Sequence, residues 1–214
     1  MKTAEYIENY KIICICRRVY GEELLKLAHA MHKGGLHMME VTFDQSDESC
    51  IEKTGKAIKM LCEEFGDEMR FGAGTVLTKE QVDAAKAAGA QYIISPNTNI
   101  ELIKYTKEQG LVSIPGAMTP SEIIAAHEAG ADFVKLFPTV RLGLSYIKDI
   151  KGPISNVKLI GTGGLTEENL KDYLDLGMTG AGISGRLVDK KLIEEGKFNI
   201  LTERAARFME IANG

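Results

Sequence analysis

The chain has 214 residues, of which 44% are hydrophobic and 26% are charged, and its formal net charge is −4. This length suits one domain with a full core, so we expect a single domain over residues 1–214. Acidic and basic residues are mixed along the chain, which argues against a nucleic-acid partner. The start lacks the apolar stretch of an export signal, and no apolar run is long enough to cross a membrane.

The cysteines and histidines are not spaced like metal ligands. Cys14 and Cys16 match no zinc pattern, and we expect both to pack on the outer face of a buried strand. The four histidines offer no ligand set: His29, His32, His37 and His127. Without an export signal, the cysteines are expected to stay reduced in the cytoplasm.

Short apolar runs alternate with longer amphipathic stretches along the chain. A short additional helix is expected over residues 1–10, ahead of the first run. The central residues of eight runs are nearly all apolar or small, which is typical of parallel strands buried on both faces. These runs are residues 11–16, 36–42, 70–74, 91–95, 111–114, 132–136, 157–160 and 179–183.

The stretches between the runs carry signals of helix ends. Thr119-Pro120-Ser121-Glu122 has the spacing of a capping box with proline at the first helical position. Thr78 precedes Gln81 by the same spacing. Glycine closes several of these stretches, as at a left-handed helix C-terminus. Residues 88–95 and 129–136 are near copies, which favours a repeated βα unit.

Eight strand–helix units predict either a closed (β/α)8 barrel or an open doubly wound sheet. The regular repeat favours the barrel, and no Gly-x-Gly-x-x-Gly turn follows the first strand. In such a barrel the chemistry lies at the C-terminal ends of the strands. Successive intervals of 20 residues place four strand ends on one rim: Thr75, Ser95, Pro115 and Lys135.

Lys135 is the sharpest candidate for chemistry. Alternation places Phe133, Lys135 and Phe137 on one face of their strand, with Val134 and Leu136 on the other. If the latter pair packs on helices, Lys135 points into the barrel. Desolvation there lowers the pKa of a lysine and makes its neutral amine a nucleophile toward a carbonyl. The alternative is a lysine that extends to solvent or pairs with a carboxylate.

Two more charged residues are expected on the inner face. Glu40 shares a strand face with Thr42, where a carboxylate near Lys135 can act as general acid or base. The alternative is a structural ion pair with Lys135 or Arg17. Alternation also turns Arg17 inward, and a guanidinium suits bidentate binding of a carboxylate or phosphate. The alternative is a surface arginine, and the neighbouring Arg18 is expected to point away.

Two glycine-rich turns follow the last two predicted strands, Gly161-Thr162-Gly163-Gly164 and Gly182-Ile183-Ser184-Gly185. Loops in this place are the usual phosphate site of the barrel fold. Glycine lets backbone N–H groups approach an anion, and Ser184 adds a hydroxyl. Glycines that merely permit a turn are the alternative, but two clusters in this place together predict phosphate binding.

These motifs, in this order, resemble the 2-keto-3-deoxy-6-phosphogluconate (KDPG) and 4-hydroxy-2-oxoglutarate (KHG) aldolases. The resemblance implies a class I carbon–carbon lyase without metal or other cofactor, with Lys135 as the Schiff-base lysine and Glu40 as the acid/base carboxylate. It covers the chain from about Lys11 to Val188. The matching segments are Met39-Glu40-Val41-Thr42-Phe43, Phe71-Gly72-Ala73-Gly74-Thr75-Val76, Ile94-Ser95-Pro96, Ile114-Pro115-Gly116, Phe133-Val134-Lys135-Leu136-Phe137-Pro138, Gly161-Thr162-Gly163-Gly164 and the turn at Ser184.

The resemblance also implies substrate-binding roles. Thr75 and an arginine hold the keto-acid carboxylate, and Pro96 and Phe137 pack on the carbon skeleton. The glycine turns supply further contacts, the last three of them to the phosphate: Thr162, Gly163, Gly164 and Ser184. Many members continue from Glu-Val-Thr into an arginine, whereas here Phe43-Asp44-Gln45 follows. Other members place the arginine after the first strand, so the carboxylate is assigned to Arg17.

The implied reaction cleaves KDPG to pyruvate and glyceraldehyde 3-phosphate, as in Entner–Doudoroff carbohydrate metabolism, and/or KHG to pyruvate and glyoxylate. The galactonate isomer of KDPG is an alternative substrate, since it differs at one carbon. The implied partners are a small 2-keto acid, expected to be phosphorylated, and further copies of the chain in a homotrimer. The fold alone leaves two other functions open: a phosphosugar epimerase or isomerase, which needs no Lys135, and a non-catalytic barrel that binds a phosphorylated ligand.

Overall fold

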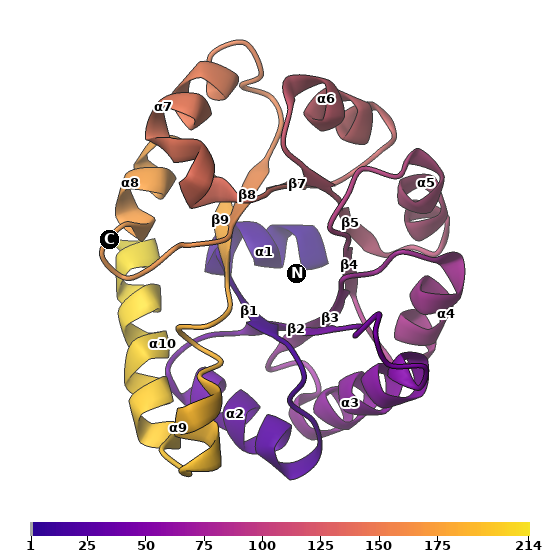
Figure 1. Cartoon of the computed structure of the whole chain (residues 1–214), viewed down its shortest axis with the longest axis vertical. Helices are drawn as coiled ribbons and strands as arrows, with labels where there is room; N and C mark the ends of the chain where they lie inside the picture. The colour runs from indigo at the N-terminus through magenta and orange to yellow at the C-terminus, as the bar shows by residue number, and fades with distance from the viewer. Residues whose placement is uncertain (1) are drawn as a thin grey trace.

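The computed structural model describes residues 2–214, so Met1, with which the predicted N-terminal helix began, lies outside the described residues. Parallel strands form a sheet that closes around an axis, and helices surround it (Figure 1). The elements in chain order are α1 (Thr3–Tyr10), β1 (Ile12–Cys16), α2 (Gly21–Lys33), β2 (Met38–Thr42), α3 (Cys50–Phe65), β3 (Arg70–Gly74), α4 (Lys79–Ala87), β4 (Tyr92–Ile94), α5 (Ile100–Glu108), β5 (Val112–Ile114), β6 (Gly116–Ala117), α6 (Pro120–Glu128), β7 (Val134–Leu136), α7 (Thr139–Lys151), β8 (Leu159–Thr162), α8 (Leu170–Asp175), β9 (Gly180–Ile183), α9 (Lys190–Glu194) and α10 (Phe198–Asn213).

All eight predicted strands are present, and the predicted (β/α)8 barrel is confirmed. One strand position is split into β5 and β6 by Pro115, which has no N–H to donate to a ladder. The Pro115 carbonyl still accepts a bond of 2.8 Å from the Lys135 N–H, and the Ser113 carbonyl accepts one of 3.0 Å from the Asp132 N–H. Together β5 and β6 therefore lie between β4 and β7 and close the barrel.

Side chains of the strands alternate between two apolar cores. The outer core, between strands and helices, contains Val134 and Leu136, and it also contains Cys14 and Cys16, as predicted. The inner core fills the lower part of the barrel. Its buried members are Tyr6, Ile7, Ile13, Met38, Tyr92, Ile94, Val112, Ile114, Phe133 and Ile160. Residues at alternate positions of β2 and β7 above this core therefore point toward the barrel axis.

Helix α1 covers the N-terminal end of the barrel and is seen through its centre in Figure 1. The Tyr6 hydroxyl donates to the carbonyl oxygen of Glu68, just before β3, at 3.2 Å. Lys158, just before β8, forms an ion pair with Glu8 at 2.6 Å between Nζ and Oε1. The predicted N-terminal helix thus forms the floor of the barrel, below its inner core.

The predicted helix ends are confirmed. Thr119 and Glu122 form a complete capping box, and the Thr78 hydroxyl accepts from the Gln81 N–H. Left-handed glycines follow the five helices after which glycine was predicted to end the helix, at Gly35, Gly89, Gly110, Gly130 and Gly177. Among residues 2–214, no helix is long and apolar enough to span a membrane.

Candidate active site

Lys135 and Glu40 both face the axis of the barrel above the inner core. Lys135 is the central residue of β7, two positions after the inward-facing Phe133. Glu40 is the central residue of β2, two positions after the inward-facing Met38, and is only 1% exposed. The charge of each acts on the pKa of the other, so the two side chains lie in one electrostatic environment.

Burial shifts the pKa values of this pair toward each other. Desolvation lowers the pKa of Lys135, the Glu40 charge opposes that shift, and the Arg17 charge adds to it. Desolvation also raises the pKa of Glu40 to about 7, against the opposing effects of Lys135 and Arg17. A lysine amine and a carboxyl group whose pKa values are brought closer together in this way exchange protons more readily than free side chains do.

Buried oxygen atoms near the site are free for a ligand. Glu40 Oε2 and Thr42 Oγ1 have no hydrogen-bond partner among the described residues. The space beside them exists because Gly74, in the neighbouring strand, has no side chain. A Cβ at position 74 would lie 2.5 Å from Glu40 Oε1 and 2.9 Å from a carbon of Thr42. Glycine at this position therefore defines where the Glu40 carboxylate can lie.

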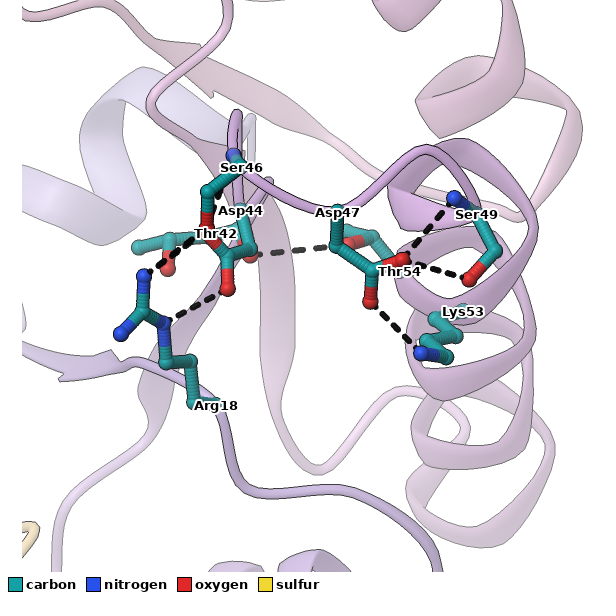
Figure 2. Close-up of polar contacts among 8 residues, drawn as sticks. All are labelled: Arg18, Thr42, Asp44, Ser46, Asp47, Ser49, Lys53 and Thr54. Atoms are coloured by element: carbon teal, nitrogen blue, oxygen red, sulfur yellow. Dashed lines mark hydrogen bonds and ion pairs between the residues drawn. The ribbon is translucent and has the colours of Figure 1, made fainter.

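The two arginines after β1 turn in different directions. Arg18 has a left-handed backbone, with φ 58°, and points to the loop after β2. Its Nε lies 2.6 Å from Asp44 Oδ2, and Nη2 donates to Asp44 Oδ1 at 2.9 Å and to Ser46 Oγ at 3.3 Å (Figure 2). These bonds hold the pKa of Asp44 far below its usual range. Arg17 is exposed, and its charge acts on Glu40 and Lys135.

The loop after β2 is also tied to its own helix. Figure 2 shows Asp47 accepting from both the backbone N–H and the hydroxyl of Ser49, at 2.9 and 2.7 Å. Lys53 Nζ lies 2.6 Å from the same carboxylate. The connection between β2 and α3, which begins with Phe43-Asp44-Gln45, is therefore held through Asp44 on one side and Asp47 on the other.

Phe137 lies beside both Lys135 and the glycine turn after β8. Lys135 Nζ is 5.3 Å from the centroid of the Phe137 ring, which is 44% exposed. A Cβ at Gly163 would lie 3.2 Å from the same ring. Pro96 is exposed at the end of β4, and a Cβ at Gly116 would lie 2.4 Å from its carbonyl oxygen. Pro96 thus packs against the β5–β6 strand, the neighbour of β7.

The two glycine-rich turns stand next to each other after β8 and β9. Gly163 and Gly164 both have left-handed backbones, with φ 97° and 84°. Thr162 is buried, and its N–H donates to Thr139 Oγ1 at 2.7 Å. Ser184 is exposed, and its hydroxyl donates to the carbonyl of Ile15 at 3.3 Å. The turns thus expose glycine backbone and one hydroxyl at the C-terminal end of the barrel.

Comparison with known proteins identifies the family. The model of the "KDPG and KHG aldolase" family matches residues 4–203 of the chain. The chain belongs to that aldolase family.

Named relatives of this aldolase cover most of its length. The chain is 34% identical over 177 residues to the 2-dehydro-3-deoxy-6-phosphogalactonate aldolase of Escherichia coli strain K12, covering 82% of this chain and 83% of the relative. It is 32% identical over 196 residues to the 2-dehydro-3-deoxy-phosphogluconate aldolase of Haemophilus influenzae, covering 91% and 89%.

Solved structures of similar proteins have the same fold. The KDPG aldolase of Legionella pneumophila, solved with pyruvate captured as a covalent carbinolamine, superposes with a TM-score of 0.85 at 28% identity and covers 97% of this chain and 98% of its own. A native KDPGal structure gives a TM-score of 0.83 at 32% identity and covers 94% of each chain.

The sequence analysis missed two pairings of polar side chains on the loops that follow the strands of this aldolase. Arg186, two residues after Ser184, forms a bidentate ion pair with Glu167 of the loop after β8, at 2.8 and 3.1 Å. Gln45 and Gln81 connect the loop after β2 to α4. In each pair the partners are far apart in the sequence and on different loops or elements, so no local periodicity signals their pairing.

Proposed function

We propose that this aldolase cleaves KDPG to pyruvate and glyceraldehyde 3-phosphate, and/or KHG to pyruvate and glyoxylate, by a Schiff-base mechanism. The observation that carries this proposal is Lys135, desolvated on the inner face of β7 with Glu40 acting on its pKa. An epimerase, an isomerase or a ligand-binding barrel does not require such a lysine. The galactonate isomer of KDPG is the second candidate substrate, since it is the substrate named for the E. coli relative.

In the proposed mechanism, the neutral amine of Lys135 attacks the C2 carbonyl of the keto acid. Loss of water gives an iminium that withdraws electrons from C3. Glu40 accepts the proton of the C4 hydroxyl, the C3–C4 bond breaks, and the aldehyde leaves. The remaining enamine is protonated at C3, and water hydrolyses the iminium to release pyruvate and the amine of Lys135. This chemistry requires no metal and no organic cofactor.

The other predicted residues bind the substrate in this proposal. Arg17 and Thr75 hold the carboxylate, and the guanidinium supplies the charge. Pro96 and Phe137 pack on the carbon skeleton. The phosphate is held at the C-terminal end of the barrel by the two glycine-rich turns, where backbone N–H groups and a hydroxyl are available. The residues of these turns are Thr162, Gly163, Gly164 and Ser184.

The setting of the reaction is part of the same proposal. The enzyme works as a single-domain homotrimer in the cytoplasm, on the Entner–Doudoroff route of carbohydrate metabolism. Free thiols at all four cysteines are compatible with a reducing compartment. Light scattering coupled to size-exclusion chromatography measures the mass of the assembly, and a monomer or dimer would contradict the trimer.

Borohydride reduction tests the Schiff base directly. Incubation with pyruvate and sodium borohydride is expected to add one reduced pyruvate to the protein, and peptide mapping is expected to locate it on Lys135. The exposed Lys158, paired with Glu8, serves as the internal control and should stay unlabelled. Folded protein that binds phosphorylated ligands but forms no adduct would instead indicate an epimerase or a ligand-binding barrel.

Replacing Gly74 by alanine is expected to lower kcat for cleavage by about 100-fold, because a displacement of about 1 Å at a catalytic group has effects of this size. The new Cβ would occupy the space of the Glu40 carboxylate, with 2.5 Å to Oε1. Gly55 lies in α3 with open space around its Cα, so Gly55→Ala is the matched control. Steady-state kinetics measure kcat for both variants. A kcat of Gly74→Ala equal to that of Gly55→Ala would contradict the placement of Glu40.

A further inference from the structure

Thr75 has a backbone conformation that needs external support. It is the first residue after β3, and its φ is 56°, in the left-handed region that residues other than glycine rarely adopt. Threonine is β-branched, which makes this conformation especially unfavourable. Such residues persist only where the surrounding structure holds them in place.

The peptide groups around Thr75 are held by neighbouring strands. On one side, the Gly74 carbonyl accepts from the Phe43 N–H at 2.9 Å. On the other side, the Val76 N–H donates to the Ile94 carbonyl at 3.1 Å. The carbonyl of Thr75 itself is held by a side chain, since it accepts from Gln45 Nε2 at 2.7 Å.

Gln45 is in turn oriented by a second glutamine. Gln81 Nε2 donates to Gln45 Oε1 at 3.1 Å, which fixes which end of the Gln45 amide faces Thr75. Gln81 is 4% exposed, and its own Oε1 accepts from the Leu77 N–H at 2.7 Å. The contacts thus run without a break from the first turn of α4, through two amides, to the backbone of Thr75.

We propose that Gln45, oriented by Gln81, is a positioning residue that keeps Thr75 in the conformation in which it binds the keto-acid carboxylate. This inference rests on the proposed function, in which Thr75 contacts that carboxylate. Gln45 belongs to the segment Phe43-Asp44-Gln45, which replaces the arginine of many family members. The segment that lacks this arginine therefore still contributes to the carboxylate site in this chain, through the bond from Gln45 to the backbone of Thr75.

A merely structural role for Gln45 predicts that its loss lowers thermal stability and leaves pyruvate trapping unchanged. Gln45 is exposed and lies on a loop, so it adds little to the apolar core and its loss is expected to cost little stability. A positioning role instead predicts weaker binding of the keto acid at unchanged thermal stability. The concentration of pyruvate that gives half-maximal borohydride trapping separates the two roles.

The test is Gln45→Met, which keeps the length of the side chain and removes its donor. Because one net hydrogen bond changes an equilibrium constant by about threefold to tenfold, half-maximal trapping is expected to need that much more pyruvate. KM for the substrate should rise by the same factor, with kcat within about twofold. Gln109→Met is the matched control, since that amide binds Lys86 near the opposite end of the barrel.

A double-mutant cycle with Thr75→Gly shows whether Gln45 acts through Thr75. Glycine adopts the left-handed backbone without help, so Gln45→Met should change trapping less than about twofold in that background. Equal trapping by wild type and Gln45→Met, or an equal effect in both backgrounds, would overturn the inference while wild-type trapping upholds the proposed function. A wild type that forms no adduct would overturn both.

Discussion

Replacing Lys135 by alanine is expected to lower kcat for cleavage by on the order of 10⁴-fold or more, because the covalent route through the iminium is lost. The fold should survive, since Val134 and Leu136 keep their places in the outer core. Loss of the lysine also removes a charge that lowers the pKa of Glu40, so the carboxyl becomes neutral more readily rather than remaining as an unpaired buried charge.

Lys158→Ala is the matched control for this variant. Lys158 lies at the opposite end of the barrel and approaches the ring of Phe133, the inward-facing residue two positions before Lys135, at 5.8 Å. Its removal breaks the ion pair with Glu8 and should leave kcat unchanged. Substantial cleavage by Lys135→Ala, measured by coupled release of pyruvate, would refute the assignment of the nucleophile.

Replacing Glu40 by glutamine is expected to change activity and stability in opposite directions. Cleavage should fall by about 10²- to 10⁴-fold, because the amide cannot accept the proton of the C4 hydroxyl. At pH 8 the variant should nevertheless be more stable than the wild type. Burial raises the pKa of Glu40 from 4.5 to about 7, so the folded protein keeps a charged carboxylate in an unfavourable place above that pH.

The pH dependence of this stability difference follows from linkage. Below pH 4.5, Glu40 is protonated in the folded and unfolded states and adds no penalty. Between 4.5 and about 7, the folded state binds more protons than the unfolded state, so stability falls as the pH rises. Above about pH 7 Glu40 is charged in both states, and its burial then lowers the free energy of unfolding by at most roughly 3 kcal/mol. The gain from Glu40→Gln should therefore be largest at pH 8 and vanish near pH 4.

Urea denaturation of wild type and Glu40→Gln at pH 4, 6 and 8 measures this difference, because titrating groups remote from Glu40 contribute equally to both proteins. In the wild type, kcat should fall as the pH drops below about 7, where Glu40 loses the charge that makes it a base. A variant that is less stable than wild type at pH 8, or a kcat independent of pH between 5 and 8, would contradict the proposed role of Glu40.

The barrel and the facing of its strand residues were predictable from the sequence, because alternation along a strand is a local property. This is why Phe133 and Val134 were placed on the correct faces. Pro115 was predicted at the rim of the barrel. Its division of one strand into β5 and β6 was not predictable, because it depends on the hydrogen bonds to both neighbouring strands, β4 and β7. The pairs Arg18–Asp44 and Arg186–Glu167 join loops that meet only when neighbouring strands pair, so no spacing in the sequence indicates them.

The left-handed conformation of Thr75 was equally hidden from the sequence. A threonine at a strand end is ordinarily extended, and the cost of another conformation is met by contacts from two other elements. Gln45 binds the Thr75 carbonyl and is itself oriented by Gln81, and these two glutamines are 36 residues apart. Gly163, by contrast, adopts the left-handed region readily because glycine has no Cβ, so its conformation needs no such support.

The floor that α1 and the inner core form beneath Lys135 has a consequence for the order in which products leave. In the proposed mechanism, water and reactants reach the Schiff base on Lys135 from the C-terminal end of the barrel, where the aldehyde half of the substrate lies. The aldehyde therefore blocks hydrolysis until it has departed, and pyruvate leaves last. In the reverse direction the proposed mechanism requires pyruvate to form the enamine first, and the apolar packing of Tyr6 and Ile7 beneath the barrel then leaves the aldehyde a single direction of approach, from the C-terminal end.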